Sequence, residues 1–455
     1  MSSKETLSLL CDYESRNVLF TEPDGSWPIV WERAKGVHVW DAEGKKYLDL
    51  TAAFGVAAAG HANPGVVKAG QRQMAKLLHA MGDVHPHALK AQLARELSRI
   101  TFERWTKLSS KAQSLKPKAL TGKVIFSNSG FEAVESALKT ALLATGRRGI
   151  IAFEGGYHGL GYGALNATHR EHFRNPFRSQ LCEFGRFVPF PKISEGRVPR
   201  VLKNEYSQRS SLREVETRIR RIFRREPIGA ILVEPVQARG GINLTPPELL
   251  PLLRRLCDDH GALLILDEIY TGFGRTGKWF ACEHSGVIPD LICLGKALTG
   301  GFPLSACVGR ADLMDAAWPA STGEAIHTST FLGHPVGCAM ALAQIKEIQR
   351  LKLCERSAAL GAELLKQLSS FHPPSSILAS ARGLGLMAGV ELTLPDGKPA
   401  TQIALDAIKT LLHRGYIFLP EGEHANVISF TPPLTITGTQ LAKAVGELKE
   451  VLTAD

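Results

Sequence analysis

Lys296 and Asp267 are the two residues of this chain whose types and positions are best suited to chemistry. Lys296 follows an apolar run at 291–294, and Asp267 comes directly after another at 262–266. Lysines in apolar surroundings often have a depressed pKa and act as amine nucleophiles on carbonyl compounds. The two residues lie about one strand–helix–strand unit apart, so they can meet at the ligand-binding edge of a parallel sheet. A structural Asp–Lys ion pair is the alternative interpretation.

Two turns carry further residues that could bind a ligand. In the first, Ser129 and Gly130 join a strand to a helix, where free backbone amides, the helix dipole and a glycine suit a phosphate group. A simple helix cap is the alternative. In the second, the glycines of 154–159 let the backbone approach a flat ligand, on which Tyr157 or His158 could stack. An ordinary turn is again the alternative.

Together these residues match the requirements of pyridoxal 5'-phosphate (PLP). The amine of Lys296 would form a Schiff base with the cofactor, and the first turn would hold its phosphate. The carboxylate of Asp267 would keep the pyridine nitrogen protonated, so that the ring can take up the electrons of a carbanion. The sequence therefore predicts a PLP site, and we expect no metal ion.

Apolar runs that alternate with helical patterns predict the framework that positions these residues. From about residue 65 this alternation favours an α/β fold in which helices cover both faces of a mostly parallel sheet. The expected strands are 123–126, 149–153, 228–233, 262–266, 291–294 and 304–308, and the expected helices include 132–145, 247–260 and 336–351.

The chain is too long for one simple core, so we expect two domains. The large, PLP-binding domain is predicted at 65–335, and a smaller α+β domain is predicted from both chain ends, 1–64 and 336–455. The run at 37–57 is antiparallel in character. Further expected elements are a strand at 384–392, a helix at 402–414, a final strand and helix, and a surface loop at 193–211.

The composition is ordinary for a globular protein, with 44% hydrophobic and 22% charged residues. No stretch is long and apolar enough to span a bilayer, and the first 16 residues show no secretory signal. The eight cysteines include no Cys-x-x-Cys pair and resemble reduced core thiols. We therefore expect a cytoplasmic protein without a membrane partner.

The formal net charge of +10 raises the question of nucleic-acid binding. Its densest contribution is the arginine-rich segment 212–225. There, apolar residues recur at helical spacing, so the arginines fall on the solvent face of an amphipathic helix. No nucleic-acid-binding motif accompanies this helix. A solvated helix face is the better interpretation, and we expect no nucleic-acid partner.

Two segments resemble those of a known family. Leu-Ile-Leu-Asp-Glu-Ile-Tyr-Thr-Gly-Phe-Gly-Arg-Thr-Gly at 264–277 and Pro-Asp-Leu-Ile-Cys-Leu-Gly-Lys-Ala-Leu-Thr-Gly-Gly at 289–301 are similar to the class III aminotransferases. The similarity runs nearly the whole length of the chain, from 39–41 through Glu-Pro-Val-Gln at 234–237 to Arg-Gly-Leu-Gly at 382–385. These enzymes are PLP-dependent and of fold type I, so the resemblance implies that fold here.

The resemblance also implies roles for individual residues. Lys296 would carry the cofactor, and Asp267 would pair with its pyridine nitrogen. The cofactor's phosphate would be held by Ser129, Gly130 and the Phe131 amide. Its ring would be contacted by Tyr157 and Ile269, with His158 beside them. Active sites of this family lie at a homodimer interface, and Thr330 would reach the partner's phosphate.

The implied reaction moves an amino group from an amine or amino acid to a 2-oxo acid or another carbonyl acceptor. Lys296 would act as the general base of the proton shift. Because the carbonyl product of the donor leaves before the acceptor binds, the kinetics should be ping-pong.

The chain departs from the family at four positions. Tyr270 stands where glutamine is common near the cofactor's phenolic oxygen, and it can still donate a hydrogen bond. His334 replaces the asparagine of a Gly-Asn-Pro motif. Leu160 and Ser429 stand where many members have arginines that bind substrate carboxylates. Neither can replace a bidentate guanidinium contact.

Two inferences about the substrate compete. Glu234 resembles the acid that pairs with the missing late arginine, so it could attract a cationic ω-amine or diamine donor. Alternatively, carboxylate binding passes to another arginine, namely Arg239 or one of Arg170, Arg174 and Arg178. Asp83 and His85 fall where the family contributes pocket residues from the neighbouring subunit, although structural roles are equally compatible with their positions.

Two other functions compete with amino-group transfer. Relatives within the family include racemases, epimerases and other PLP enzymes, and the missing arginines make an isomerase an alternative. A non-catalytic ligand-sensing regulator is the remote alternative. Such a regulator would need an appended DNA-binding module, and residues 1–36 are too short to hold one.

Overall fold

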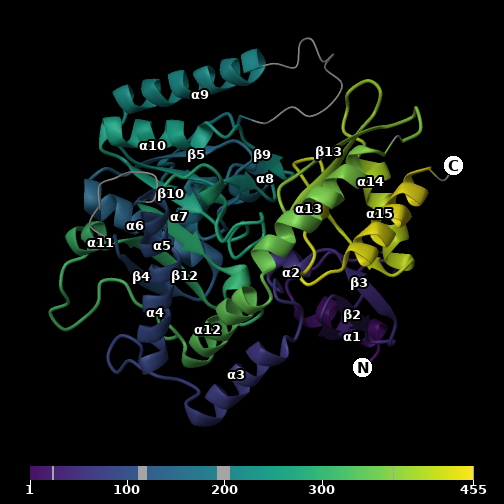
Figure 1. Ribbon diagram of the computed structural model, residues 1–455, viewed down its shortest axis with the longest axis horizontal. Helices are drawn as coiled ribbons and strands as arrows, with labels where there is room; N and C mark the ends of the chain where they lie inside the picture. The colour runs from purple at the N-terminus through teal and green to yellow at the C-terminus, as the bar shows by residue number, and fades with distance from the viewer. Residues whose placement is uncertain (23–24, 111–119, 192–204, 372, 454–455) are drawn as a thin grey trace.

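A seven-stranded sheet is the centre of the fold (Figure 1). The computed structural model describes the chain except residues 23–24, 111–119, 192–204, 372 and 454–455. In spatial order the strands are β4 (Gly122–Ser127), β12 (Ser305–Arg310), β11 (Leu291–Leu294), β10 (Leu263–Asp267), β7 (Ile228–Val233), β5 (Gly149–Phe153) and β6 (Gly185–Val188).

Most of this sheet is parallel. The pairs β11–β10, β10–β7, β7–β5 and β5–β6 are parallel, whereas β12 runs antiparallel to both β11 and β4. Parallel neighbours require crossover connections, which here carry α-helices except between β10 and β11, where the connection at 268–290 contains only a short 3-10 helix. The expected α/β fold of type I is confirmed, with β6 as a strand that the sequence analysis missed.

Helices cover both faces of the sheet, because alternate side chains of each strand point to opposite sides. Ile150 and Ala152 pack in one core with α6 (Gly130–Thr145), α7 (Tyr162–Leu165) and α11 (Ala311–Ala317). Ile151 and Phe153 pack in the other core with α4 (Ala88–Ile100), α5 (Phe102–Ser110), α9 (Glu205–Arg225) and α10 (Leu249–His260). A sheet buried on both faces explains why its strands read as continuous apolar runs.

Segments from the two chain ends build two smaller sheets. The first has the order β1 (Trp31–Lys35), β2 (His38–Asp41), β3 (Lys46–Asp49) and β15 (Tyr416–Ile417), so β15 adds a C-terminal strand to an N-terminal meander. The second has the order β13 (Leu378–Gly383), β14 (Ala388–Thr393), β17 (Val427–Phe430) and β16 (Leu419–Glu421). The first helix, α1 (Ser3–Tyr13), and the last, α15 (Gly438–Thr453), lie on the same side of the molecule (Figure 1).

The remaining elements connect or flank these sheets. Helix α12 (Pro335–Arg350) packs against α3 (Pro64–Lys76) and α4. The other helices and short elements are α1 (Ser3–Tyr13), α2 (Ala52–Gly55), α8 (Glu171–Arg174), η1 (Asn175–Gln180), β8 (Val236–Gln237), β9 (Asn243–Leu244), η2 (Ala281–His284), η3 (Lys296–Leu298), α13 (Leu353–Ser369), α14 (Thr401–His413) and α15 (Gly438–Thr453). The division into domains at 1–64, 65–335 and 336–455 stays a proposal.

Two local expectations need correction. The expected strand at 384–392 begins only at Ala388, as β14, because residues 384–387 form the turn of a hairpin with β13 and Gly385 there takes a left-handed conformation (φ +60°). The expected loop at 193–211 contains the start of α9 at Glu205, and its first part lies outside the described residues. Polar composition concealed this helix start.

Helix α9 presents its arginines to solvent, as its amphipathic pattern indicated. Val215 and Ile219 are fully buried against the sheet. Arg218 and Arg220 instead form ion pairs with acids one turn earlier, at 2.8 and 2.9 Å. Within the part of the chain that the structure describes, no helix combines the length and apolarity needed to cross a membrane.

Candidate active site

The structure places Lys296 and Asp267 at the same edge of the large sheet. Asp267 is the last residue of β10, and its register partner on the neighbouring parallel strand β11 is Cys293. Lys296 follows β11 and opens η3 with a left-handed backbone conformation (φ +37°). Both residues line one cavity of 430 Å³. The strand ends therefore bring the acid and the amine together, as their spacing predicted.

Asp267 is buried and hydrogen-bonded through both carboxylate oxygens. Oδ1 accepts the backbone N–H of Ile269 at 3.1 Å, and Oδ2 lies 2.8 Å from Nδ1 of His158. Burial, the largest single effect, lowers the pKa of His158, but the hydrogen bond to Asp267 and the negative charges of Asp267 and Glu234 together outweigh it, so the net shift is upward. His158 thus lines the cavity with its ring held by Asp267, and its contact with a cofactor stays a prediction.

Lys296 has the environment of a reactive amine. Burial lowers the pKa of Lys296, and the negative charges of Asp267 and Glu234 only partly oppose this shift. Its Nζ lies 4.5 Å from the centre of the Tyr270 ring. The Tyr270 hydroxyl is hydrogen-bonded to Oγ1 of Thr431 at 3.2 Å. The ring of Tyr270 therefore faces the amine, and donation of its hydroxyl to a cofactor stays a prediction.

The start of α6 forms one wall of the cavity. The Glu132 carboxylate accepts the N–H and Oγ–H of Ser129 at 2.7 and 2.8 Å, which closes the helix cap. Gly130 and Phe131 follow in the first turn and line the cavity. Amides of a first turn have no partner within their own helix. A Cβ on Gly130 would lie 3.1 Å from two atoms of Ile269, so glycine allows this close packing.

These residues fit PLP on the grounds of their chemistry. An amine of lowered pKa, a carboxylate, helix-start amides and a glycine packed closely against Ile269 all face one cavity. Tyr157, which the sequence predicts as a ring contact, also lines this cavity, as does Ile269. Lys296, Asp267, Gly130, Phe131, Tyr157 and Ile269 are thus in position for the roles that we expect of them.

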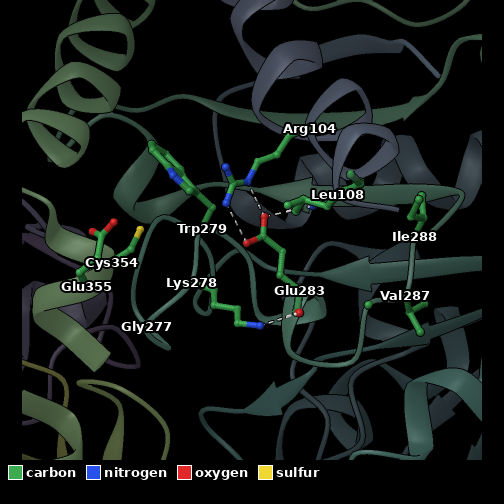
Figure 2. A pocket seen from close by; sticks show the side chains of 12 residues that line it. Arg104, Leu108, Gly277, Lys278, Trp279, Glu283, Val287, Ile288, Cys354 and Glu355 are labelled. Atoms are coloured by element: carbon green, nitrogen blue, oxygen red, sulfur yellow. Dashed lines mark hydrogen bonds and ion pairs between the residues drawn. The ribbon is translucent and has the colours of Figure 1, made fainter. Parts of the chain in front are cut away.

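A larger cavity of 660 Å³ lies elsewhere in the molecule (Figure 2). Among its charged groups, Nε of Arg104 contacts Oε1 of Glu283 at 3.0 Å, and Nζ of Lys278 donates to the backbone carbonyl of Glu283 at 2.9 Å. Neither Lys296 nor Asp267 lines it. The smaller cavity is therefore the candidate active site, despite its size.

Gly159 illustrates how tightly the cavity wall is built. Its φ of +112° is unfavourable for other residues, and a Cβ there would lie 2.3 Å from Cβ of Phe131. We expect Gly159→Ala to displace Phe131 and weaken PLP binding by about 1–3 kcal/mol, or roughly 5- to 150-fold in affinity. Fluorescence titration of the apoenzyme measures this affinity. Gly323→Ala is the control, since Gly323 has φ +140° with no atom within 4 Å, and equal losses in both variants would contradict the steric explanation.

Glu234 follows β7 and is buried at the cavity. Its two oxygens accept the backbone N–H groups of Tyr157 at 3.0 Å and Ala238 at 3.2 Å. Burial raises the pKa of Glu234. The nearby His158 lowers this pKa in part, whereas the negative charge of Asp267 raises it further. Within the described residues no cation forms an ion pair with Glu234, which leaves its negative charge available to a ligand.

Arg239 is the one arginine among the described residues that line this cavity. It lies between β8 and β9, and its Nη1 is 3.2 Å from Oε2 of Glu421. Glu421 ends β16 and was missed by the sequence analysis. Its signal was an acid directly after the apolar run 417–420, the same kind of signal that singled out Asp267.

The other arginines considered from the sequence are engaged elsewhere. Arg170 donates to the carbonyl of Gly422. Arg174 lies over the Phe187 ring, and Arg178 pairs with a surface acid, Glu183. None of the three lines the cavity that holds Lys296. Their proposed role in carboxylate binding is not supported by these positions.

The two positions at which arginines are missing differ from each other. Leu160 lines the cavity mouth and is about half exposed. Ser429 is buried in β17, and its hydroxyl donates to the carbonyl of Leu419 at 3.1 Å. Neither side chain offers a positive charge, so a carboxylate would need another partner.

Asp83, His85 and Thr330 lie outside the cavity of their own chain. All three are exposed. Asp83 accepts a hydrogen bond from Thr328 at 2.6 Å, which ties its segment to the loop that carries Thr330. The structure thus joins these residues into one surface region, and their roles in a partner's site stay predictions.

Comparison with known proteins agrees with this site. Residues 20–452 match the family described as aminotransferase class-III. The 5-aminovalerate aminotransferase DavT of Pseudomonas aeruginosa is 35% identical, with 93% of each chain covered. The putrescine aminotransferase of Pectobacterium atrosepticum is 36% identical over 94% of this chain and 83% of that protein.

A solved structure shows the same fold. The (S)-enantioselective omega-transaminase of Thermomicrobium roseum superposes with a TM-score of 0.86 at 27% identity, covering 99% of this chain and 98% of that one. The leading prediction, amino-group transfer, is confirmed over the isomerase and regulator alternatives. The chain belongs to the class III aminotransferase family and is a PLP-dependent aminotransferase.

Proposed function

We propose that this enzyme takes the amino group from a terminal, cationic amine of the diamine type and passes it to a 2-oxo acid. The observation that carries the proposal is Glu234, a buried carboxylate at the cavity without a cationic partner among the described residues. The relatives' names support a terminal amine, because 5-aminovalerate and putrescine both carry a primary amine at a chain end.

The charges around the cavity favour a cationic donor. Asp267 and Lys296 are reserved for the cofactor, so the substrate meets Glu234 and Arg239, and Glu421 lies behind Arg239 as its buried ion-pair partner. Arg239 and Glu421 balance each other, which leaves one negative charge at Glu234. Burial strengthens its attraction for an ammonium group, since few water molecules screen it.

Each residue of the site has a separate chemical role. When bound here, PLP supplies an electron sink for the carbon that carries the amine. Asp267 holds a proton on a pyridine nitrogen placed beside it, and His158 stabilises the charge of Asp267. The lowered pKa of Lys296 favours its neutral form, which can accept the substrate's proton and return it. Glu234 orients the distal ammonium group of the donor.

We also propose that the enzyme is a cytoplasmic homodimer. Large apolar side chains are exposed in and after α3 and at Phe331, which lies 5.4 Å from the ring of His79. This is the region that carries Asp83, His85 and Thr330, so a second copy placed there would bury it and bring Thr330 towards the other site. All eight cysteines are free thiols, which suits a reducing compartment.

Glu234→Gln tests the donor. We expect the Michaelis constant (KM) for putrescine to rise about 10- to 100-fold, which corresponds to losing a hydrogen bond to a charged group. The KM for a 2-oxo acid should change much less. Initial rates over a matrix of donor and acceptor concentrations separate the two constants. Glu154→Gln, at an exposed position, is the charge-matched control.

The pH dependence gives a second measure of the same residue. Because the pKa of Glu234 is raised, its carboxyl group loses its charge at a higher pH than an exposed glutamate. The KM for putrescine should therefore rise as the pH falls through this pKa, and Glu234→Gln should lack this rise. If the variant raised both constants equally, or kept the pH dependence, Glu234 would not be the ammonium receptor.

A further inference from the structure

The contact between Arg239 and Glu421 differs from an ordinary structural ion pair. Glu421 is 2% exposed, whereas the Arg239 side chain is 33% exposed and faces the cavity. Oε2 of Glu421, the oxygen nearest to Arg239, has no hydrogen-bond partner within the described part of the chain. A buried acid is thus held by a cation that also reaches the ligand space.

Such a pair can exchange partners. Its closest contact is the 3.2 Å approach of Nη1 to Oε2, without hydrogen-bond geometry. A guanidinium group binds a free carboxylate more strongly when two parallel hydrogen bonds form. A substrate carboxylate that enters the cavity can offer this bidentate geometry, whereas Glu421 does not.

We propose that Arg239 is the receptor for the carboxylate of the 2-oxo acid, and that Glu421 is the internal carboxylate that Arg239 releases when this substrate binds. The inference rests on the proposed function in one respect, namely that the acceptor is a 2-oxo acid. It assigns to Arg239 and Glu421 the selection of the second substrate, whereas Glu234 selects the first. Leu160 and Ser429 take no part.

Release of Arg239 from Glu421 should change the protonation of Glu421. Burial raises the pKa of Glu421 to about 7, and the positive charges of Arg239, Arg170 and Lys296 oppose this rise. The phenol of Tyr270 is the other titratable group that interacts with Glu421. When Arg239 turns to a substrate, its stabilisation of the Glu421 carboxylate is lost, and the pKa rises further. Binding of a carboxylate at neutral pH should therefore be accompanied by proton uptake.

Acceptor kinetics test the role of Arg239. In Arg239→Gln we expect the KM for pyruvate to rise about 10- to 100-fold, because a charge-assisted hydrogen bond is lost. The KM for propanal, which has no carboxylate, should not change. Arg178→Gln is the control, because Arg178 pairs with Glu183 outside the cavity. Equal increases for both acceptors in Arg239→Gln would overturn the proposal.

Calorimetry tests Glu421 without turnover. Glutarate, a dicarboxylate that has neither amine nor carbonyl group, is titrated into the holoenzyme in buffers of different ionisation enthalpy. We expect proton uptake in the unmodified enzyme, no uptake and tighter binding in Glu421→Gln, and at least tenfold weaker binding in Arg239→Gln. Proton uptake that persists in Glu421→Gln would overturn the proposal, and so would unchanged affinity in Arg239→Gln. Thermal unfolding establishes that the variants are folded.

The two proposals fail in different experiments. The donor is tested in the first half-reaction with putrescine, and Arg239 is tested with acceptors and glutarate. If putrescine is not a donor, another amine can load the enzyme for the acceptor measurements. The result for Arg239 and Glu421 then stands by itself.

Discussion

Lys296→Ala is expected to lower the rate of amino-group transfer by at least about 10³-fold, since it removes both the nucleophile and the general base. Lys296 supplies the primary amine of the cavity, and burial lowers its pKa towards the range in which an amine can accept a proton. His158, which also lines the cavity, is not expected to take over this role, because its Nδ1 is held 2.8 Å from Asp267.

Single-turnover absorbance measurements with putrescine and with pyruvate follow the two half-reactions of this variant. PLP should still bind, because the start of α6 and Asp267 are unchanged, but sodium borohydride should no longer attach it covalently to the protein. Lys278→Ala is the matched control, as Nζ of Lys278 bonds to the Glu283 carbonyl in the other cavity. Near-normal turnover in Lys296→Ala would make this lysine structural.

The sequence predicts the large sheet well because the strands are buried on both faces. Each reads as a continuous apolar run, so β5, β7 and β11 begin and end where the pattern does. Strand β6 lies at the sheet edge, where Arg186 and Phe187 are only partly buried, and its pattern is correspondingly weak. The hairpin of β13 and β14 depends on the backbone conformation of Gly385, which hydrophobicity does not report.

Some residues of the site can be identified from local sequence patterns, whereas others come together only through the fold. Lys296, Asp267 and Gly130 stand at strand or helix ends, where the local pattern and the resemblance both identify them. The pairing of Arg239 with Glu421 joins residues far apart in the sequence, because the fold places the segment between β8 and β9 beside the end of β16. The sequence therefore offers Glu234 and Arg239 as candidate substrate residues, but it does not predict that Arg239 pairs with Glu421.

Asp267→Asn is expected to reduce the turnover number (kcat) by about 10²- to 10⁴-fold, with much smaller changes in KM. The amide matches the carboxylate in shape, and Oδ1 can still accept the Ile269 N–H. What it loses is the negative charge that holds a proton on a neighbouring pyridine nitrogen. The effect should therefore fall on the proton-transfer step and leave substrate binding nearly intact.

His158→Leu, which has no hydrogen-bonding side-chain atom, separates the charge of Asp267 from its positioning. This variant keeps the carboxylate but removes the Nδ1 contact at 2.8 Å, so we expect only about a 10- to 100-fold loss in kcat. The double variant should be little worse than Asp267→Asn alone, because His158 acts through Asp267 and the two effects are not additive. Stopped-flow rates for the four proteins complete the cycle. If the losses multiplied, His158 would contribute independently of Asp267, and the carboxylate would not be the group through which the imidazole acts.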